Sequence, residues 1–322
     1  MRNIAKVSVC IPVYGVEKYI EKCARTLFEQ TLQEIEYIFV DDCTPDRSIE
    51  ILQNVLEDYP HRKEQVKIIH HEKNSGLVAA RNTALKHVSG EYVIHCDSDD
   101  WVELDMYETM YNKAKETDAD MVYCDFINEY SNGRKKTAGQ VNTDNSEDFL
   151  NMMYSGELAG TLCNKLYRRQ IALCKSIESP TNIIMGEDHL RNTFMLPLCT
   201  KIVYVHSFFY HYFINSLSYT HNENKDWIRK KIKNMCFINS YAEKLFGIRQ
   251  DILFQAKCNT LIACINAGNA SEIYKQLYPE CKRQIFRKKI PLKTKMTIAV
   301  ANLSYHSAYL LLKIYRFARH GF

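Results

Sequence analysis

The stretch EYVIHCDSDDW, residues 91–101, decides the fold because it begins as an apolar run and ends in clustered carboxylates. Its first half has the composition of a buried strand, whereas Asp97, Asp99 and Asp100 follow within four positions. Like charges repel, carboxylates are costly to desolvate, and a turn needs at most one such residue. An oxygen-loving cation, or a ligand that carries one, would resolve this conflict.

Short apolar runs and amphipathic stretches alternate over the first 125 residues. Five runs are too short for helices and too continuous for half-exposed strands, so they predict parallel strands covered on both faces. They are VSVCI (7–11), YIFV (37–40), VKII (66–69), YVIHC (92–96) and MVYC (121–124). Apolar residues at helical spacing over 19–28 and 77–88 predict intervening helices, the second capped by Ser75. This order predicts an α/β fold with a doubly wound, mostly parallel sheet.

Acidic residues follow two of the predicted strands. Asp41 and Asp42 come after the second strand, as Asp97, Asp99 and Asp100 come after the fourth. Because parallel strands share one carboxyl-terminal edge, these five side chains are expected to meet there, and we call them the carboxylate rim. Such oxygen ligands suit Mn²⁺ or Mg²⁺ better than zinc or copper. The chain lacks a P-loop and a G-x-G-x-x-G after its first strand, so a nucleotide diphosphate held through a metal remains.

Composition places the chain among soluble globular proteins. It has 322 residues, of which 46% are hydrophobic and 25% charged. We expect a cytoplasmic protein, because the N-terminus has no secretory signal and no segment reaches about 18 uninterrupted apolar residues. Its 12 cysteines include no C-x-x-C pair, which indicates reduced core thiols rather than a zinc site.

Charge divides the chain into two parts. Residues 225–322 hold 19 Lys+Arg and 5 Asp+Glu, whereas the remainder holds 23 and 33. We therefore expect an α/β domain over 1–220 and a basic, mainly helical region over 225–322, with a helix starting at Pro291. The basic region suits either an anionic membrane surface, at the inner face of the plasma membrane, or packing on the domain over 1–220 or on a homodimer partner. Nucleic acid is not an expected partner, because no recognition motif accompanies the charge.

The sequence resembles the family-2 glycosyltransferases of the GT-A fold over residues 7–196, and two aromatic patches extend the match to 218. The matching stretches are VSVCIPVYGVEKYIEKCARTL, YIFVDDCTPD, NSGLVAARNTAL, GEYVIHCDSDDW, CNKLYRR and MGEDHLRNTFM. The resemblance implies an inverting enzyme that moves a sugar from a nucleotide-diphosphate donor, expected to be UDP-linked, to a glycan or lipid-linked acceptor hydroxyl in surface-polysaccharide synthesis. A nucleotidyl or phosphoryl transferase, or an inactive sugar-nucleotide binding module, stays open as an alternative.

The resemblance also implies roles for individual residues. Asp99 should ligate the metal, and Asp97 should contact the ribose or a metal-bound water. Asp42 should accept hydrogen bonds from the uracil edge or ribose, and Asp100 should either join this site or cap the following helix. Arg81 should support the diphosphate or base side of the donor, with a helix-surface arginine as the alternative. The remaining donor-binding candidates are Pro12, Val13, Tyr14 and Ser98, with Asp41 as an additional candidate.

An acceptor hydroxyl must lose its proton, and a carboxylate within hydrogen-bond reach can take it. MGEDHLRN supplies Glu187 and Asp188, which match the family's Glu-Asp motif, and the resemblance implies that Asp188 is the base. Acidic residues in a first helical turn also favour the helix dipole, which is the alternative explanation. His211 is an additional candidate for a metal or diphosphate site. The chain departs from the family at Phe213, where arginine is usual, and at Gly15, where asparagine is common.

Overall fold

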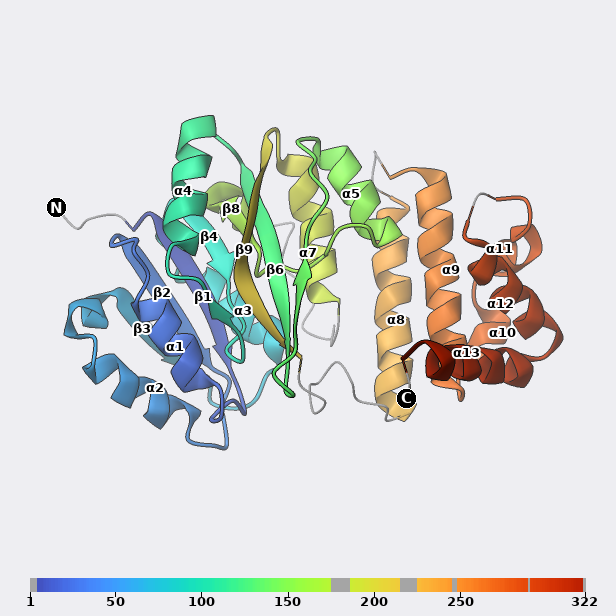
Figure 1. Cartoon of the computed structure of the whole chain (residues 1–322), viewed down its shortest axis with the longest axis horizontal. Helices are drawn as coiled ribbons and strands as arrows, with labels where there is room; N and C mark the ends of the chain where they lie inside the picture. The colour runs from blue at the N-terminus through green and yellow to red at the C-terminus, as the bar shows by residue number, and fades with distance from the viewer. Residues whose placement is uncertain (1–4, 175–185, 215–224, 245–247, 289, 321–322) are drawn as a thin grey trace. The chain divides into compact units, whose positions relative to one another are not determined.

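The computed structural model describes residues 5–174, 186–214, 225–244, 248–288 and 290–320 (Figure 1). The chain forms two compact units, Met1–Leu150 with Glu157–Ser218, and Asn151–Gly156 with Tyr219–Phe322. The first unit contains the sheet, and the described part of the second unit is helical.

A nine-stranded sheet forms the centre of the first unit. Four neighbouring parallel strands come first, in the order β3 (Val66–His70), β2 (Ile35–Asp41), β1 (Val7–Val13) and β4 (Tyr92–His95). The order continues through β8 (Lys165–Arg168), β6 (Met121–Tyr130), β9 (Ile202–Ile214) and β5 (Trp101–Val102), and β7 (Lys135–Ala138) pairs with β6. Strands β6 and β9 run parallel to each other, whereas β5, β7 and β8 are antiparallel to the strands they pair with. The other six strands run in one direction, and the predicted mostly parallel α/β sheet is confirmed.

The sequence predicts no strand at the position of β8, which lies between β4 and β6. The strand expected at 121–124 exists within β6, but antiparallel β8 separates it from β4. Strand β8 is four residues long and starts with Lys165, so it carries no continuous apolar run. Lys165 is only 1% exposed, and its ammonium donates to the carbonyls of Ala159 and Thr161 at 2.8 and 2.6 Å. A buried lysine satisfied by a neighbouring loop hides this strand from pattern analysis.

Helices cover the sheet, and the whole of β1 is buried, as expected for a strand covered on both faces. Helix α1 (Ile20–Phe28) turns Ile20, Cys23 and Leu27 into the core, as its apolar spacing predicts. The other helices that lie wholly within the described part of this unit are α2 (Ser48–Glu57), η1 (Pro60–Gln65), α3 (Leu77–Leu85), α4 (Met106–Thr117), α6 (Arg169–Ala172), α7 (Glu187–Met195) and η3 (Leu196–Leu198). Helix α5 (Ser146–Ser155) begins in the first unit and ends in the second.

The start of α3 differs from the predicted serine cap. Gly76 precedes the helix with φ of 88°, and the Ser75 hydroxyl donates to the carbonyl of Lys73. The carboxylate of Asp42 instead accepts the backbone N–H groups of Ser75 and Gly76 at 2.8 and 2.7 Å. An acid from the end of β2 therefore fixes the amino-terminal end of α3, where negative charge is favourable.

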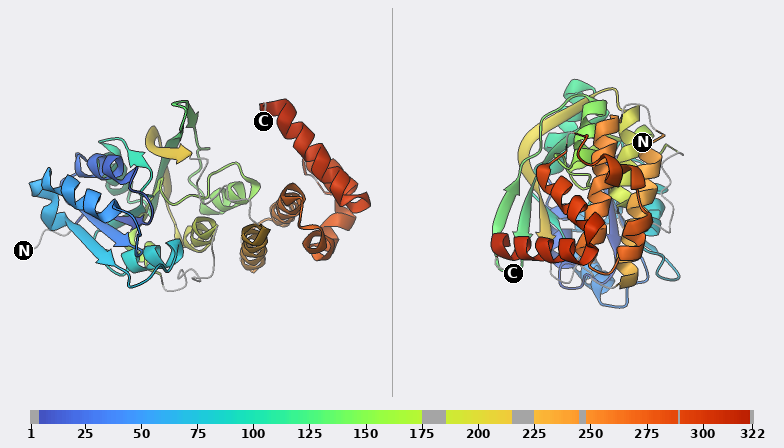
Figure 2. Two further views of the ribbon diagram at one scale, coloured as in Figure 1. Left: turned by 90° about the horizontal axis from the view of Figure 1, so that it is seen from below. Right: turned by 90° about the vertical axis from the view of Figure 1, so that its right-hand side faces the viewer.

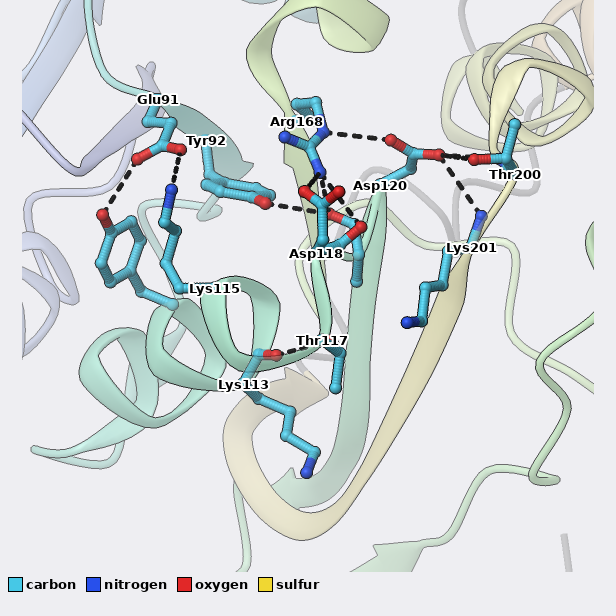
Figure 3. A network of polar contacts seen from close by, with 12 residues as sticks. Glu91, Tyr92, Lys113, Lys115, Thr117, Asp118, Asp120, Arg168, Thr200 and Lys201 are labelled. Carbon is cyan, nitrogen blue, oxygen red and sulfur yellow. Dashed lines mark hydrogen bonds and ion pairs between the residues drawn. The ribbon is translucent and has the colours of Figure 1, made fainter.

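A polar network fastens the start of β6 to β8 and to the residues before β9 (Figure 3). Arg168 Nε donates to Asp120 Oδ1 at 3.0 Å, and its Nη2 donates to Asp118 at 2.6 Å. The other Asp120 oxygen accepts the N–H and the hydroxyl of Thr200 at 2.8 and 2.6 Å. Burial raises the pKa of Asp120, but the bonds from Thr200 and Arg168 outweigh it and hold this pKa below its ordinary value.

We expect Asp120→Asn to lower the free energy of unfolding by about 2 kcal/mol, because an amide NH₂ would face donors that are now satisfied by the carboxylate. Asp118→Asn is the matched control: Asp118 pairs with the same arginine, but its side chain is 89% exposed, so a loss below about 1 kcal/mol is expected. Urea denaturation of both variants measures the difference. Equal losses would contradict the structural role given to Asp120.

The second unit has its own hydrophobic core. Its helices are α8 (Lys225–Ala242), α9 (Gln250–Ala267), α10 (Ser271–Gln276), α11 (Pro279–Gln284), α12 (Leu292–Leu303) and α13 (Tyr305–His320), the last two drawn towards red in Figure 2. Leu261, Ile298 and Leu312 are among its buried residues, and Pro291 occupies the N-cap of α12, which confirms the predicted helix start.

Across the described ranges, no helix has the length and apolarity required to pass through a bilayer. All twelve cysteines are free thiols.

Candidate active site

The strand ends bring the carboxylate rim to one edge of the sheet. Asp41 ends β2 and lies beside Val13 of β1, and the N–H of Asp42 donates to the Val13 carbonyl at 3.0 Å. Residues 97–100 follow β4, the parallel neighbour of β1 on its other side. The acidic residues of β2 and β4 therefore flank the end of β1, as the strand order predicts.

Arg81 of α3 links this edge to α7. Its Nη1 donates to Glu187 at 2.8 Å and to Asp188, and its Nη2 donates to Asp97 at 2.6 Å. We call these four residues the Arg81 cluster. Arg81 is 2% exposed, so the helix-surface alternative is wrong. Burial disfavours its charge, but the three carboxylates hold the pKa of Arg81 well above its ordinary value.

The two acids of α7 differ in accessibility. The side chain of Glu187 is 8% exposed and that of Asp188 is 21% exposed. Burial and the neighbouring Asp188 charge raise the pKa of Glu187 to about 7. Burial also raises the pKa of Asp188, against the lowering effect of Arg81, and the second oxygen of Asp188 accepts the N–H of Leu162 at 3.2 Å. Asp188 is thus a positioned carboxylate with more than its ordinary basicity.

Asp99 is a partly buried rim acid close to other negative charge. Burial and the charge of Asp97 raise the pKa of Asp99 to about 6. Among the described residues it forms no ion pair, and no group of three His, Cys, Asp or Glu side chains could hold a metal. Mg²⁺ and Mn²⁺ often use one or two carboxylates together with phosphate oxygens and water. Asp99 and Asp97 fit an ion that arrives with a phosphate ligand, but not a pre-formed protein cage.

Asp42 is already saturated by contacts with the protein. It is 3% exposed, and besides the two N–H groups before α3 it contacts Nδ1 of His71 at 2.7 Å. The other ring nitrogen of His71 lies 2.9 Å from the Thr83 hydroxyl of α3. Asp42 therefore positions the helix that carries Arg81, and a donor contact by Asp42 remains a prediction.

The other predicted donor residues divide by exposure. Pro12 and Val13 are buried within β1, and the Val13 side chain belongs to the hydrophobic core, so only the backbone of this pair can face a ligand. Tyr14 is 50% exposed directly after the strand, whereas Ser98 is buried. Tyr14 thus offers a nucleotide an accessible aromatic ring.

Asp100 and Asp41, like Asp42 and Asp97, have partners within the protein. Asp100 accepts the Tyr210 hydroxyl at 2.6 Å and the N–H of Phe213 at 2.7 Å, so its predicted alternative as a helix cap is wrong. These bonds fix β9 to the segment after β4. Asp41 accepts the N–H of Thr44 at 2.8 Å and contacts the His70 ring at 2.9 Å.

His211 lies apart from these contacts. Its ring nitrogens are 2.6 Å from Glu129 and 2.7 Å from Glu103, and its ring stacks on Trp101. The side chain is 7% exposed and is held on both nitrogens by carboxylates of β6 and of the residue after β5. These contacts give no support to the predicted metal or diphosphate role of His211.

Sequence reasoning missed Arg191 and His71. Arg191 of α7 is 2% exposed and donates to Asn82, the neighbour of Arg81 on α3. Burial and the charge of Arg81 lower the pKa of Arg191 to about 10. Arg191 lies within MGEDHLRNTFM and His71 lies two residues after the VKII run, but neither has a spacing that predicts its partner.

Comparison with known proteins identifies the family. Residues 8–174 match the model of glycosyl transferase family 2. The chain is 30% identical to EpsH of Bacillus subtilis over 74% of this chain and 64% of that protein. It is 31% identical to the glycosyltransferase GlyA of Streptococcus pneumoniae over 71% of this chain and 34% of that protein. The chain thus spans less than two thirds of the length of these relatives.

Solved structures show the same fold. Residues 1–349 of S. aureus TarS superpose with a TM-score of 0.68 at 20% identity, covering 98% of this chain and 92% of that one. The mannosyltransferase PcManGT of Pyrobaculum calidifontis, solved with GDP-Man and Mn²⁺, gives a TM-score of 0.57 at 15% identity, covering 97% and 86%. At such identities the likeness concerns the fold alone. The chain is therefore a member of glycosyltransferase family 2 and has the GT-A fold.

Proposed function

We propose that this chain is an inverting glycosyltransferase that moves a sugar from a UDP-sugar to a glycan or lipid-linked acceptor hydroxyl in surface-polysaccharide synthesis. The observation that carries the proposal is the Arg81 cluster, which joins Asp97 of the rim to Asp188 of α7 through one buried guanidinium. TarS structures with UDP and UDP-GlcNAc support the donor class. A relative named poly(ribitol-phosphate) beta-glucosyltransferase, 28% identical over 80% of this chain and 37% of that protein, supports the acceptor class.

The donor half of the proposed site uses the end of β1 and the segment after β4. The nucleotide lies against Tyr14 and the backbone of Pro12 and Val13, and Asp97 and Ser98 contact its ribose. Asp99 and Asp97 would hold Mn²⁺ or Mg²⁺, which when bound neutralises charge on the departing nucleoside diphosphate. Arg81 is buried and engaged by three carboxylates, so it acts as a positioning residue rather than a direct donor ligand.

The acceptor half uses Asp188 as the general base. Its carboxylate oxygen takes the proton of the acceptor hydroxyl while the hydroxyl oxygen bonds to the anomeric carbon and the nucleoside diphosphate leaves. The raised pKa of Asp188 strengthens it as a base, and the Arg81 and Leu162 contacts orient it. A single displacement of this kind inverts the anomeric configuration.

A thermal-shift screen tests the proposed function. UDP-glucose, UDP-GlcNAc, UDP-galactose and GDP-mannose are compared with Mn²⁺ and with EDTA. At a ligand concentration of 100 Kd, a UDP-sugar should stabilise the chain by about 2.7 kcal/mol in Mn²⁺ and clearly less in EDTA. Shifts of equal size without metal, or no shift with any UDP-sugar, would contradict the proposal.

We expect Asp99→Asn to weaken donor binding in Mn²⁺ by at least about tenfold, because metal-ligand substitutions cost affinity of this order or more. In EDTA the variant and the wild type should bind UDP with similar affinity. Asp58→Asn is the matched control, since its side chain is 59% exposed and pairs only with Arg25 in the described structure. Isothermal titration with UDP measures all three proteins, and an undiminished Mn²⁺ dependence in Asp99→Asn would remove Asp99 as a ligand.

A further inference from the structure

The last two long helices each present an apolar face that no described residue covers. On α12 the exposed apolar residues are Leu292, Met296 and Leu303, which are 70%, 52% and 91% exposed. Positions 4 and 11 residues apart lie on the same side of a helix, so the three side chains form one stripe. The opposite side of α12 carries Ile298, which is fully buried in the core of the second unit.

Helix α13 repeats this arrangement. Leu310, Leu311 and Ile314 are 43%, 54% and 65% exposed. Ile314 is four residues from Leu310 and three from Leu311, so the three side chains lie on one side of the helix. Ala308 and Leu312 lie on the other side and pack into the core. Both helices therefore have an inner apolar face that serves folding and an outer apolar face that does not. We call the six outer side chains the outer apolar face.

Basic residues accompany this face without any acidic ones. Residues 281–322 contain 10 Lys+Arg and no Asp or Glu. Lys293 and Lys313 are exposed on the same two helices, and the Lys293 ammonium lies 3.5 Å from the centre of the Tyr315 ring. Phe286 and Arg287 are also exposed just before α12. The segment thus combines accessible apolar side chains with uncompensated positive charge.

We propose that the outer apolar face of α12 and α13 binds an anionic bilayer surface, with the two helices lying in the interface. Apolar side chains enter the boundary between headgroups and acyl chains, and the lysines contact anionic headgroups. A second copy of the chain fits this face less well, because a two-fold interface would place the same acid-free segment against itself. This binding is separate from the sugar-transfer chemistry, and it places the enzyme where a lipid-linked acceptor is found.

Vesicle co-sedimentation of the full chain tests the proposal. Vesicles of phosphatidylcholine are compared with vesicles that also contain phosphatidylglycerol. The variant Leu303→Ser/Leu311→Ser/Ile314→Ser changes only exposed side chains and should lower binding to the anionic vesicles by at least about 100-fold. Lys293→Gln/Lys313→Gln should lower it by about 10- to 30-fold, and added salt should weaken the wild type.

The matched control is Leu104→Ser/Leu173→Ser/Leu198→Ser, which removes three leucines of the first unit with exposures of 47%, 41% and 44%. It should bind like the wild type. The proposal is overturned if both triple variants bind equally, or if neutral vesicles bind as well as anionic ones. It is also overturned if light scattering shows a wild-type dimer that the Leu303→Ser/Leu311→Ser/Ile314→Ser variant dissociates, with no vesicle binding by either protein. Because the readout is binding, a failure leaves the proposed sugar transfer untouched.

Discussion

Asp188→Asn is expected to reduce sugar transfer by about 10²- to 10⁴-fold while the affinity for UDP stays within a few-fold of the wild type. The amide cannot take the acceptor proton. Its single oxygen can accept either the N–H of Arg81 or that of Leu162, which bond different oxygens of Asp188, so one of these two bonds is lost in the variant. Single-turnover transfer and titration with UDP measure the two quantities separately. Loss of both would favour a structural role for Asp188, and undiminished transfer would exclude it as the base.

Glu187→Gln is the matched control for this result. Glu187 also pairs with the Arg81 guanidinium, but its pKa is about 7 and its side chain is 8% exposed. It is therefore only partly ionised at neutral pH and less accessible than Asp188. We expect its transfer rate to stay within about tenfold of the wild type, since no proton transfer is lost. If Glu187→Gln were as damaging as Asp188→Asn, the assignment of the base to Asp188 rather than Glu187 would fail. The same pair of variants separates the enzyme from an inactive binding module, because the module would show no transfer to lose.

Arg81→Met is expected to lower the free energy of unfolding by about 3–5 kcal/mol at neutral pH, because it leaves three partly or fully buried carboxylates without their cation. Arg81→Lys keeps the charge, but a single ammonium cannot donate to Asp97 and to the two acids of α7 as the two guanidinium nitrogens do. Lysine should therefore restore only part of the stability. Arg25→Met is the control. Arg25 pairs with two carboxylates but has a 39% exposed side chain, and a loss below about 1 kcal/mol is expected.

The stability deficit of Arg81→Met should depend on pH with a definite sign. Glu187 already has a folded-state pKa of about 7 against an ordinary value of 4.5, so the native state holds a proton that the unfolded chain releases. Such a group stabilises the fold below its unfolded pKa and loses this effect as pH rises through its folded pKa. Removing Arg81 raises the pKa values of Glu187 and Asp188 further, so the deficit should grow from about pH 5 to about pH 8. Urea denaturation across this range measures it, and a deficit that shrinks with rising pH would contradict the role of Arg81.

The sequence predicts the parallel strands and the acids at their ends well, for a physical reason. Strands buried on both faces are continuous apolar runs, and an acidic residue directly after such a run must lie at the strand's carboxyl end. Asp42 and Asp97 are therefore placed correctly at the edge of the sheet. Strand β8 is not predicted, because its buried Lys165 donates to loop carbonyls and no periodicity in the sequence indicates this.

The partners of these acids are harder to predict, because they come from distant parts of the chain. Arg81 and Asp188 are 107 positions apart, and Asp100 and Phe213 are 113 apart. The apolar pattern of α3 does not show that Arg81 faces inward, since its neighbours Ala80 and Ala84 are small. Only tertiary packing places Arg81 among three carboxylates and brings Asp100 within hydrogen-bond distance of Tyr210 and Phe213 of β9.

A crystal structure with UDP and Mn²⁺ tests the central claim most directly, namely that the acids at the ends of β2 and β4, together with α7, form one donor and acceptor site. We expect the nucleotide at the end of β1 beside Tyr14, the ion on Asp99, and the Asp188 carboxylate facing the position of the transferred sugar. Nucleotide bound at another edge of the sheet, or an ion held without Asp99, would contradict the account.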